Sequence, residues 1–151
     1  MEKFQTLPDA IDLAKFAHRN QLDKAGFPYI EHPLRVLANV QAQGGRPFVQ
    51  IAAVLHDVVE DTPFTLDILL ALGFSPAAVR LVDLVTRKDS VQTEIYYNNI
   101  AVNSDARMIK MADISDNTLE WRLSYLPDET QDRLRKKYAK ALDSISRLAV
   151  G

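Results

Sequence analysis

The stretch with the greatest chemical potential is an apolar run that carries one imidazole and three carboxylates. It reads Ile51-Ala-Ala-Val-Leu-His56-Asp57-Val-Val-Glu60-Asp61-Thr62. In a continuous helix, Glu60 lies one turn beyond His56 and Asp57, and Asp61 lies one turn beyond Asp57. The four polar groups then share one edge of the helix. An edge of this kind attracts a divalent metal ion.

The composition narrows the class of protein and of metal site. The 151 residues are 47% hydrophobic and 25% charged, which predicts one compact domain spanning residues 1–151. A net charge of -2 argues against a nucleic-acid platform. No window approaches the roughly 20 apolar residues of a membrane span, and the N-terminus lacks an apolar signal core. We therefore expect a cytoplasmic protein without a membrane or nucleic-acid partner.

The sequence has no cysteine, so any metal ion must be bound by His, Asp, Glu and water. Such ligands suit Mn, Mg, Fe or Zn. An isolated histidine in an apolar helix is more often a core residue than a ligand. That interpretation weakens if His56 and Asp57 meet His32, from the start of the preceding helix, and Asp113, from a later one. Two imidazoles and two carboxylates form a suitable site for Mn, Fe or Zn, with positions left for water and substrate.

Hydrophobic spacing, prolines and glycines predict an all-α bundle of about seven to eight helices that position these groups. His32 is expected at the N-cap of the second helix, because Pro33 suits a first turn. The expected helices cover about residues 7–24, 33–43, 48–60, 66–72, 76–85, 93–102, 107–119 and 127–147. The helix over 48–60 should be central. The last helix is charged and is most simply a half-solvated outer face, although it could also bind a partner.

Four ordered segments resemble a known family. They are Ala17-His18-Arg-Asn-Gln21, Lys24-Ala-Gly26-Phe-Pro28-Tyr29-Ile-Glu-His32-Pro33, Leu55-His56-Asp57-Val-Val-Glu60-Asp61-Thr62 and Lys110-Met-Ala-Asp113. Their order and spacing are similar to the HD superfamily of metal-dependent phosphohydrolases, and in particular to the hydrolase domain of RelA/SpoT-type alarmone enzymes. The resemblance covers about residues 7–125. The length of the chain is similar to that of the small stand-alone hydrolases.

The resemblance implies manganese bound by His32, His56, Asp57 and Asp113. It also implies hydrolysis of the 3′-pyrophosphate from guanosine tetra- or pentaphosphate (ppGpp or pppGpp). A metal ion in this site would lower the pKa of a bound water and polarise a phosphoryl oxygen.

Glu60 and Asp61 are expected beside the reacting water rather than on the metal. Because their charges are crowded together, one of them should have a raised pKa and could exchange a proton with the nucleophile or the leaving group. The alternative is that both carboxylates merely solvate the end of a helix.

Further residues are candidates for substrate binding. Asn117 lies one turn after Asp113, and the matching asparagine of the family contacts the nucleotide. Lys24 matches a lysine of the family's nucleotide pocket, and Tyr29 could form an aromatic wall or serve only in packing. Lys110, one turn before Asp113, could neutralise phosphate or extend to solvent at the rim.

Departures from the family pattern concern the nucleotide side. Asp23 replaces an arginine that stacks on guanine in the family, and Asp116 stands in a segment where the family has basic residues. Trp121 could provide a replacement stacking surface, although a lone tryptophan is more often packed in the core. His18 and Gln21 match the family's first helix and are expected to orient a ligand or a loop through hydrogen bonds.

These departures leave other functions open. One alternative is an HD-type phosphohydrolase that acts on another nucleotide, either an adenosine alarmone resembling ppApp or a nucleoside monophosphate. Another is a metal-binding sensor without turnover, against which the intact Glu60, Asp61 and Asn117 argue. A purely structural network of buried acids would require unusually complete hydrogen bonding. The sequence leaves the oligomeric state open.

Overall fold

The computed structural model describes residues 3–150, and the predicted domain boundaries at 1 and 151 lie outside this range. Within it the chain is helical, with one isolated bridge between Leu22 and Pro28, so the predicted all-α class is confirmed. The helices of the described range are α1 (Leu7–Ala17), α2 (Glu31–Ala42), α3 (Pro47–Leu55), α4 (Val58–Asp61), α5 (Leu66–Ala71), α6 (Pro76–Val85), α7 (Thr93–Ala101), α8 (Ser104–Asn117), α9 (Glu120–Leu123) and α10 (Asp128–Val150).

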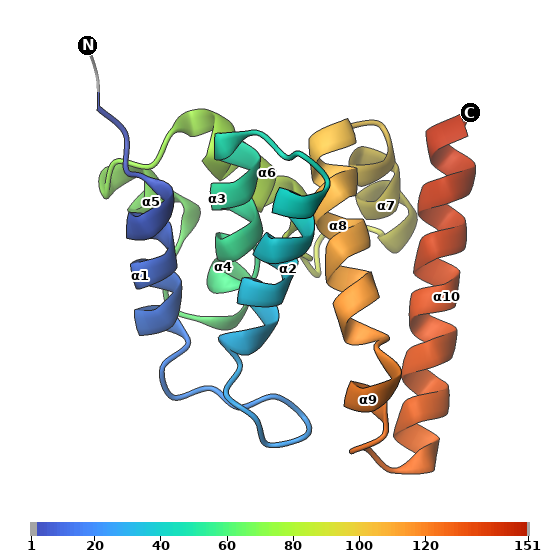
Figure 1. The fold of residues 1–151 in the computed structure, drawn as a ribbon. Helices are drawn as coiled ribbons and strands as arrows, with labels where there is room; N and C mark the ends of the chain where they lie inside the picture. The colour runs from blue at the N-terminus through green and yellow to red at the C-terminus, as the bar shows by residue number, and fades with distance from the viewer. Residues whose placement is uncertain (1–2, 151) are drawn as a thin grey trace.

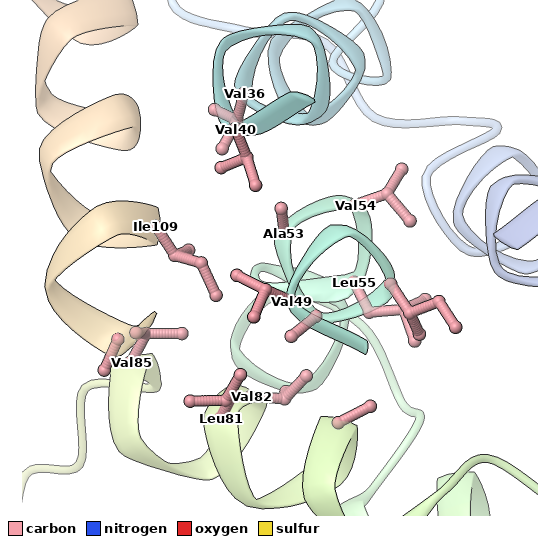
Figure 2. Close-up of a cluster of buried hydrophobic side chains, with 14 of the residues drawn as sticks. Val36, Val40, Val49, Ala53, Val54, Leu55, Leu81, Val82, Val85 and Ile109 are labelled. Carbon is pink, nitrogen blue, oxygen red and sulfur yellow. The ribbon is translucent and has the colours of Figure 1, made fainter. Parts of the chain in front are cut away.

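Helix α3 lies at the centre of the bundle, as predicted. It packs against α1, α2, α6 and α8 (Figure 1). Figure 2 shows Val49 and Ala53 of α3 among Val36 of α2, Val82 of α6 and Ile109 of α8, all of them buried. Burying an aliphatic side chain of this size stabilises a fold by roughly 1.5–3 kcal/mol. The end of α3 is therefore held in place by the most completely buried part of the molecule.

Short polar side chains cap the first turns of several helices. Thr65 accepts a hydrogen bond from the Ile68 amide at the start of α5, and Ser75 accepts one from Ala78 at the start of α6. At the start of α8 the cap is Asn103. The Asn103 side chain accepts from two backbone amides, a geometry that the sequence alone does not distinguish from a serine cap.

Three predicted boundaries differ in ways that affect the site. The first helix ends at Ala17 rather than near residue 24, because a turn and a loop begin at His18. His32 lies in the first turn of α2, whose N-cap is Ile30, so the N-cap prediction was wrong. The continuous helix expected over 48–60 is divided into α3 and α4, with the break at His56 and Asp57.

The C-terminal part of the chain adds a second wall to the bundle. Helix α10 runs along α7 and α8, on the far side of the molecule from α1 (Figure 1). The loop over residues 18–30 lies at the same end of the molecule as α9, and the ring of Phe27 meets the ring of Tyr125 edge-on at 5.0 Å between centroids. A chain segment near the N-terminus and one near the C-terminus thus close one end of the site. Within residues 3–150, no helix combines the length and the apolar character of a membrane span.

Candidate functional site

The break between α3 and α4 lets two neighbouring side chains reach one point. The amide of His56 bonds to the carbonyl of Ala53, three residues back, and Asp57 has φ -102° and ψ -3°. In a regular helix, successive side chains diverge by about 100°. The tightened turn brings Nε2 of His56 to 3.0 Å from Oδ2 of Asp57. The sequence predicted the pair but not the local structure that makes the pair converge.

Three separate elements bring the candidate ligands together. His32 comes from the first turn of α2, His56 and Asp57 come from the α3–α4 break, and Asp113 comes from α8. One potential ligand atom from each of the four lies within 4.8 Å of the others. All four side chains are almost completely buried. Residues up to 81 positions apart in the sequence therefore form one compact cluster.

The hydrogen bonds of the imidazoles indicate what the cluster can hold. Nδ1 of His56 lies 2.7 Å from the carbonyl oxygen of Ala53, which can only accept, so Nδ1 carries a proton. Nδ1 of His32 lies 2.6 Å from a carboxylate oxygen of Asp116 in the same way. Both Nε2 atoms then face the cluster, where Oδ1 of Asp113 is 2.8 Å from His32 and 3.2 Å from His56.

If the imidazoles are neutral, each Nε2 atom carries a lone pair that points at a carboxylate. That arrangement is unfavourable unless a cation or added protons lie between them. Burial by itself lowers the pKa of His56, yet Asp57 and Asp113 raise that pKa well above its usual value. Burial likewise opposes ionisation of Asp113, whereas Lys110 and the two histidines hold its pKa well below the usual value. The cluster is thus a negatively charged cage that favours positive charge at its centre, and its donor set fits a divalent metal.

Three of the four predicted substrate-binding residues contact the same cluster, whereas Lys24 lines a separate cavity formed by the loop. Tyr29 donates its hydroxyl proton to Oδ2 of Asp57 at 2.6 Å. Lys110 donates to Oδ2 of Asp113 at 3.0 Å, and Asn117 donates its amide to Oδ1 of Asp113 at 3.1 Å. These contacts fix the orientation of both carboxylates. They also place three polar side chains around the cluster, where a substrate oxygen could approach.

Glu60 and Asp61 lie at the solvent side of the cluster. Glu60 accepts from the backbone amide of Arg87 at 2.6 Å through Oε1, and Asp61 accepts from Gln21 at 3.3 Å. Loss of hydration raises the pKa of each carboxyl group, and the negative charge of Asp57 adds to the rise. Neither carboxylate belongs to the group of four candidate ligands. Both therefore lie beside the cluster as carboxyl groups with raised pKa values.

Two adjoining cavities open from this cluster. The inner cavity has a volume of about 640 Å³ and is lined by the candidate ligands His56, Asp57 and Asp113 together with Arg87, Lys110 and Lys140. Lys137 is a further basic side chain of this cavity, so four basic side chains in all lie in the walls that also hold the acidic ligands. A cavity that combines a cation site with basic side chains can hold a polyphosphate.

The second cavity, called the loop cavity, has a volume of about 440 Å³ and is lined by both charged and apolar side chains. Its walls include Lys24 and Phe27 of the loop over residues 18–30, Arg122 of α9 and leucines of α9 and α10. The two cavities share Tyr29, Glu60, Asn117, Lys137 and Tyr138 as walls. A ligand with a flat apolar end and a charged end could extend across both.

Residues of α9 and α10 are the main part of the site that the sequence did not predict. Lys137 and Tyr138 line both cavities, although their helix was expected to be an outer face. Its buried positions, Leu134, Ala141 and Ile145, show that one face is packed. The available signal was this apolar spacing, which places Tyr138 next to the packed face.

Two expectations about the nucleotide side change with the structure. Trp121 lines neither cavity, and the guanidinium of Arg35 lies over its ring at 5.3 Å. Asp23 and Asp116 do not leave bare negative charge in the pocket, because Arg122 pairs with both carboxylates. Arg122 reaches Asp23 from 99 positions away in the sequence, a pairing that no local pattern indicates.

His18, Gln21 and Asp61 are joined by a chain of hydrogen bonds. Nδ1 of His18 lies 2.8 Å from Oε1 of Gln21, whose amide donates to Asp61. The ring of His18 is buried and lies 5.1 Å from the ring of Tyr29. The arrangement agrees with the predicted orienting role rather than with a place among the four candidate ligands.

Comparisons with known proteins agree with this geometry. A family model described as "HD domain" matches residues 10–115. The chain is 35% identical to human MESH1, named as a guanosine-3′,5′-bis(diphosphate) 3′-pyrophosphohydrolase, over 71% of this chain and 64% of that protein. The Drosophila melanogaster protein of the same name is 33% identical, over 83% of this chain and 74% of its own length.

Longer proteins and a solved structure are also similar. A probable GTP pyrophosphokinase of Mycobacterium leprae is 39% identical over 93% of this chain, which spans only 18% of that protein's length. A solved structure, described as a metazoan orthologue of SpoT that hydrolyses ppGpp, aligns with a TM-score of 0.79 and 27% identity. The alignment covers 99% of this chain and 93% of that one. With the family model and the relatives in agreement, the chain belongs to the HD domain family, as the resemblance in its four motifs predicted.

Proposed function

We propose that this protein is a metal-dependent phosphohydrolase that removes the 3′-pyrophosphate from a guanosine 3′,5′-polyphosphate such as ppGpp or pppGpp. One observation carries the proposal: two imidazole Nε2 atoms and two carboxylates converge at the end of a cavity lined with basic side chains. The names of the relatives, which specify a 3′-pyrophosphohydrolase of guanosine 3′,5′-bis(diphosphate), support the choice of substrate.

His32, His56, Asp57 and Asp113 would hold the metal ion, for which manganese is our proposal. Mixed nitrogen and oxygen donors suit manganese as well as iron or zinc, and the resemblance to the alarmone hydrolases favours manganese. When bound, the ion would lower the pKa of a water molecule and neutralise charge on a phosphoryl oxygen. Tyr29, Lys110 and Asn117 keep the two carboxylates oriented towards it.

Glu60 and Asp61 would manage the protons of the hydrolysis. The Arg87 amide holds Oε1 of Glu60, and Oε2 makes no hydrogen bond within residues 3–150. This oxygen can therefore take a proton from the attacking water, because its raised pKa brings it closer to neutral pH. Water adds to the phosphorus next to O3′, the P–O3′ bond breaks, pyrophosphate leaves, and O3′ takes up a proton. Asp61 is placed to exchange that proton with solvent.

The substrate would extend across the two cavities. Lys110, Lys137 and Lys140 in the inner cavity would neutralise phosphate, while Asn117 would contact the nucleotide at the shared wall. Lys24 in the loop cavity would bind the remaining charged end. Tyr29 would form a wall beside the ligand where the two cavities meet. The loop cavity also has enough apolar wall to cover a base.

The test is a product analysis with a panel of nucleotides. Purified protein would be freed of metal with a chelator, supplied with Mn²⁺, and incubated separately with ppGpp, ppApp and GMP. We expect pyrophosphate and GDP from ppGpp, with the highest kcat/KM of the three. Orthophosphate from GMP, or a clear preference for ppApp, would overturn the guanosine assignment. Absence of turnover on all three would overturn the enzymatic proposal.

A further inference from the structure

The two imidazoles of the candidate metal centre have different partners behind them. Nδ1 of His56 bonds to a backbone carbonyl, that of Ala53. Nδ1 of His32 bonds to the carboxylate of Asp116 at 2.6 Å. A charged acceptor makes a stronger hydrogen bond than a neutral one and increases the electron density of the ring. His32 is therefore the imidazole whose orientation and basicity depend on a side chain.

Both carboxylate oxygens of Asp116 accept hydrogen bonds from arginine side chains. Arg35 donates from Nε to Oδ1 at 2.7 Å and also contacts Oδ2 at 3.3 Å. Arg122, which follows Asp116 in the sequence whereas Arg35 precedes it, donates to Oδ2 at 2.8 Å. The carboxylate is buried, charged and unable to rotate without breaking several bonds.

Arg122 connects this carboxylate to the substrate side. It contacts Oδ1 of Asn117 at 3.2 Å, which leaves the Asn117 amide pointing at Asp113. Its other terminal nitrogen lies 3.4 Å from Asp23, whose second oxygen accepts from two backbone amides of the loop. One guanidinium thus contacts a group behind His32, a wall of both cavities and the loop that forms the loop cavity.

We propose that Asp116, clamped by Arg35 and Arg122, is a positioning residue that holds His32 with Nδ1 protonated and Nε2 aimed at the metal ion. This inference rests on the metal site of the proposed function and adds a residue to it. The bond between the Asp116 carboxylate and Nδ1 of His32 fixes which ring nitrogen carries the proton. Without it, His32 could present either nitrogen to the ion.

The experiment compares Asp116→Ala, which removes the acceptor, with Asp116→Asn, which keeps an acceptor oxygen but loses the charge. Mn²⁺ affinity would be measured by competition with a chelator, using the full chain. We expect affinity to fall by about ten- to hundredfold in Asp116→Ala and by less in Asp116→Asn. Asp105→Ala is the matched control, because Asp105 lies on the same helix and pairs with an arginine outside both cavities.

A spectroscopic readout separates positioning from a merely structural effect. In ¹H–¹⁵N spectra of the Zn²⁺-loaded protein, the Nδ1 proton of His32 should give a strongly downfield signal that Asp116→Ala loses. The Nδ1 proton of His56 should be unchanged in the same spectrum, because its partner is a backbone carbonyl.

Wild-type affinity and an unchanged His32 signal in Asp116→Ala would overturn the inference while leaving the proposed function intact. A lower melting temperature without any change in affinity or signal would overturn it as well. Failure of the wild-type protein to bind Mn²⁺ would instead remove the proposed metal site, and this inference with it.

Discussion

The metal side and the loop side of the site are built in opposite ways. The candidate ligands are buried and come from elements that pack on α3, the centre of the core. The loop cavity is formed by an exposed loop and by α9 and α10, and its residue Leu22 is 63% exposed. The proposed metal site is therefore anchored in the core, whereas the loop cavity is built from surface segments that can vary without disturbing the fold. The contrast also separates the two departures from the family pattern, because Asp23 lies in the loop over residues 18–30, whereas Asp116 is buried on α8 behind His32.

The largest expected effect comes from the metal side. Asp57→Asn should abolish measurable hydrolysis, because it removes a charge from the cage and a ligand from the proposed metal. Asp83→Asn is the control, since this side chain is 43% exposed and lines neither the inner cavity nor the loop cavity. Initial rates of pyrophosphate release at saturating Mn²⁺ would measure the effect. Wild-type rates in Asp57→Asn would show that the cluster is not the reactive centre.

The second effect separates proton transfer from metal binding. Glu60→Gln should lower kcat by about a hundredfold to ten-thousandfold while leaving Mn²⁺ affinity close to that of the wild type. A joint loss of affinity would place Glu60 on the metal and contradict its proposed role.

The pH profile should reveal the same group. A base must be ionised to act, and partial burial raises the pKa of Glu60 above the usual 4.5. Activity should therefore be lost as the pH falls through a midpoint above 4.5, and Glu60→Gln should remove that limb of the kcat profile. A wild-type limb at or below the usual carboxyl value would contradict the assignment.

On the substrate side we expect a change of binding rather than of chemistry. Lys137→Ala should raise KM for ppGpp about tenfold, because a charged hydrogen bond to phosphate is worth roughly 1.5–3 kcal/mol, and it should leave Mn²⁺ affinity unchanged. Lys136→Ala is a matched control on the same helix, exposed and outside both cavities. Steady-state kinetics of the two variants would be compared at fixed ionic strength. Equal KM values would exclude α10 from substrate binding.

The smallest expected change in KM tests whether Trp121 lies outside the substrate site. Trp121→Leu should change KM by less than about twofold, since the ring lies outside both cavities. Loss of the contact with Arg35 should lower the free energy of unfolding by about 0.5–1 kcal/mol, measured by urea denaturation. A large rise in KM would restore the stacking role that the sequence suggested.

Local sequence was sufficient for the parts of the molecule that local chemistry determines. The apolar spacing predicted the central helix over Val49 and Ala53. The resemblance of four motifs to a known family predicted which histidines and acids would meet. The break at His56 was missed, because hydrophobic spacing continues through it and only the bundle around it requires the tighter turn.

The missed part of the site depends on contacts between distant segments. Arg122 and Lys137 carry no local motif, and their roles arise only when α9 and α10 fold back over the loop over residues 18–30. Asp116 looked like an unfavourable charge in the sequence. The structure gives it two arginines and an imidazole as partners.

The most direct test of the account is the position of a bound metal ion. Crystals of the protein grown with saturating Mn²⁺ would be measured at a wavelength that reveals anomalous scattering from manganese. We predict one strong peak enclosed by Nε2 of His32, Nε2 of His56 and the carboxylates of Asp57 and Asp113. A peak at another place, or none within this cluster at saturating Mn²⁺, would contradict the central claim.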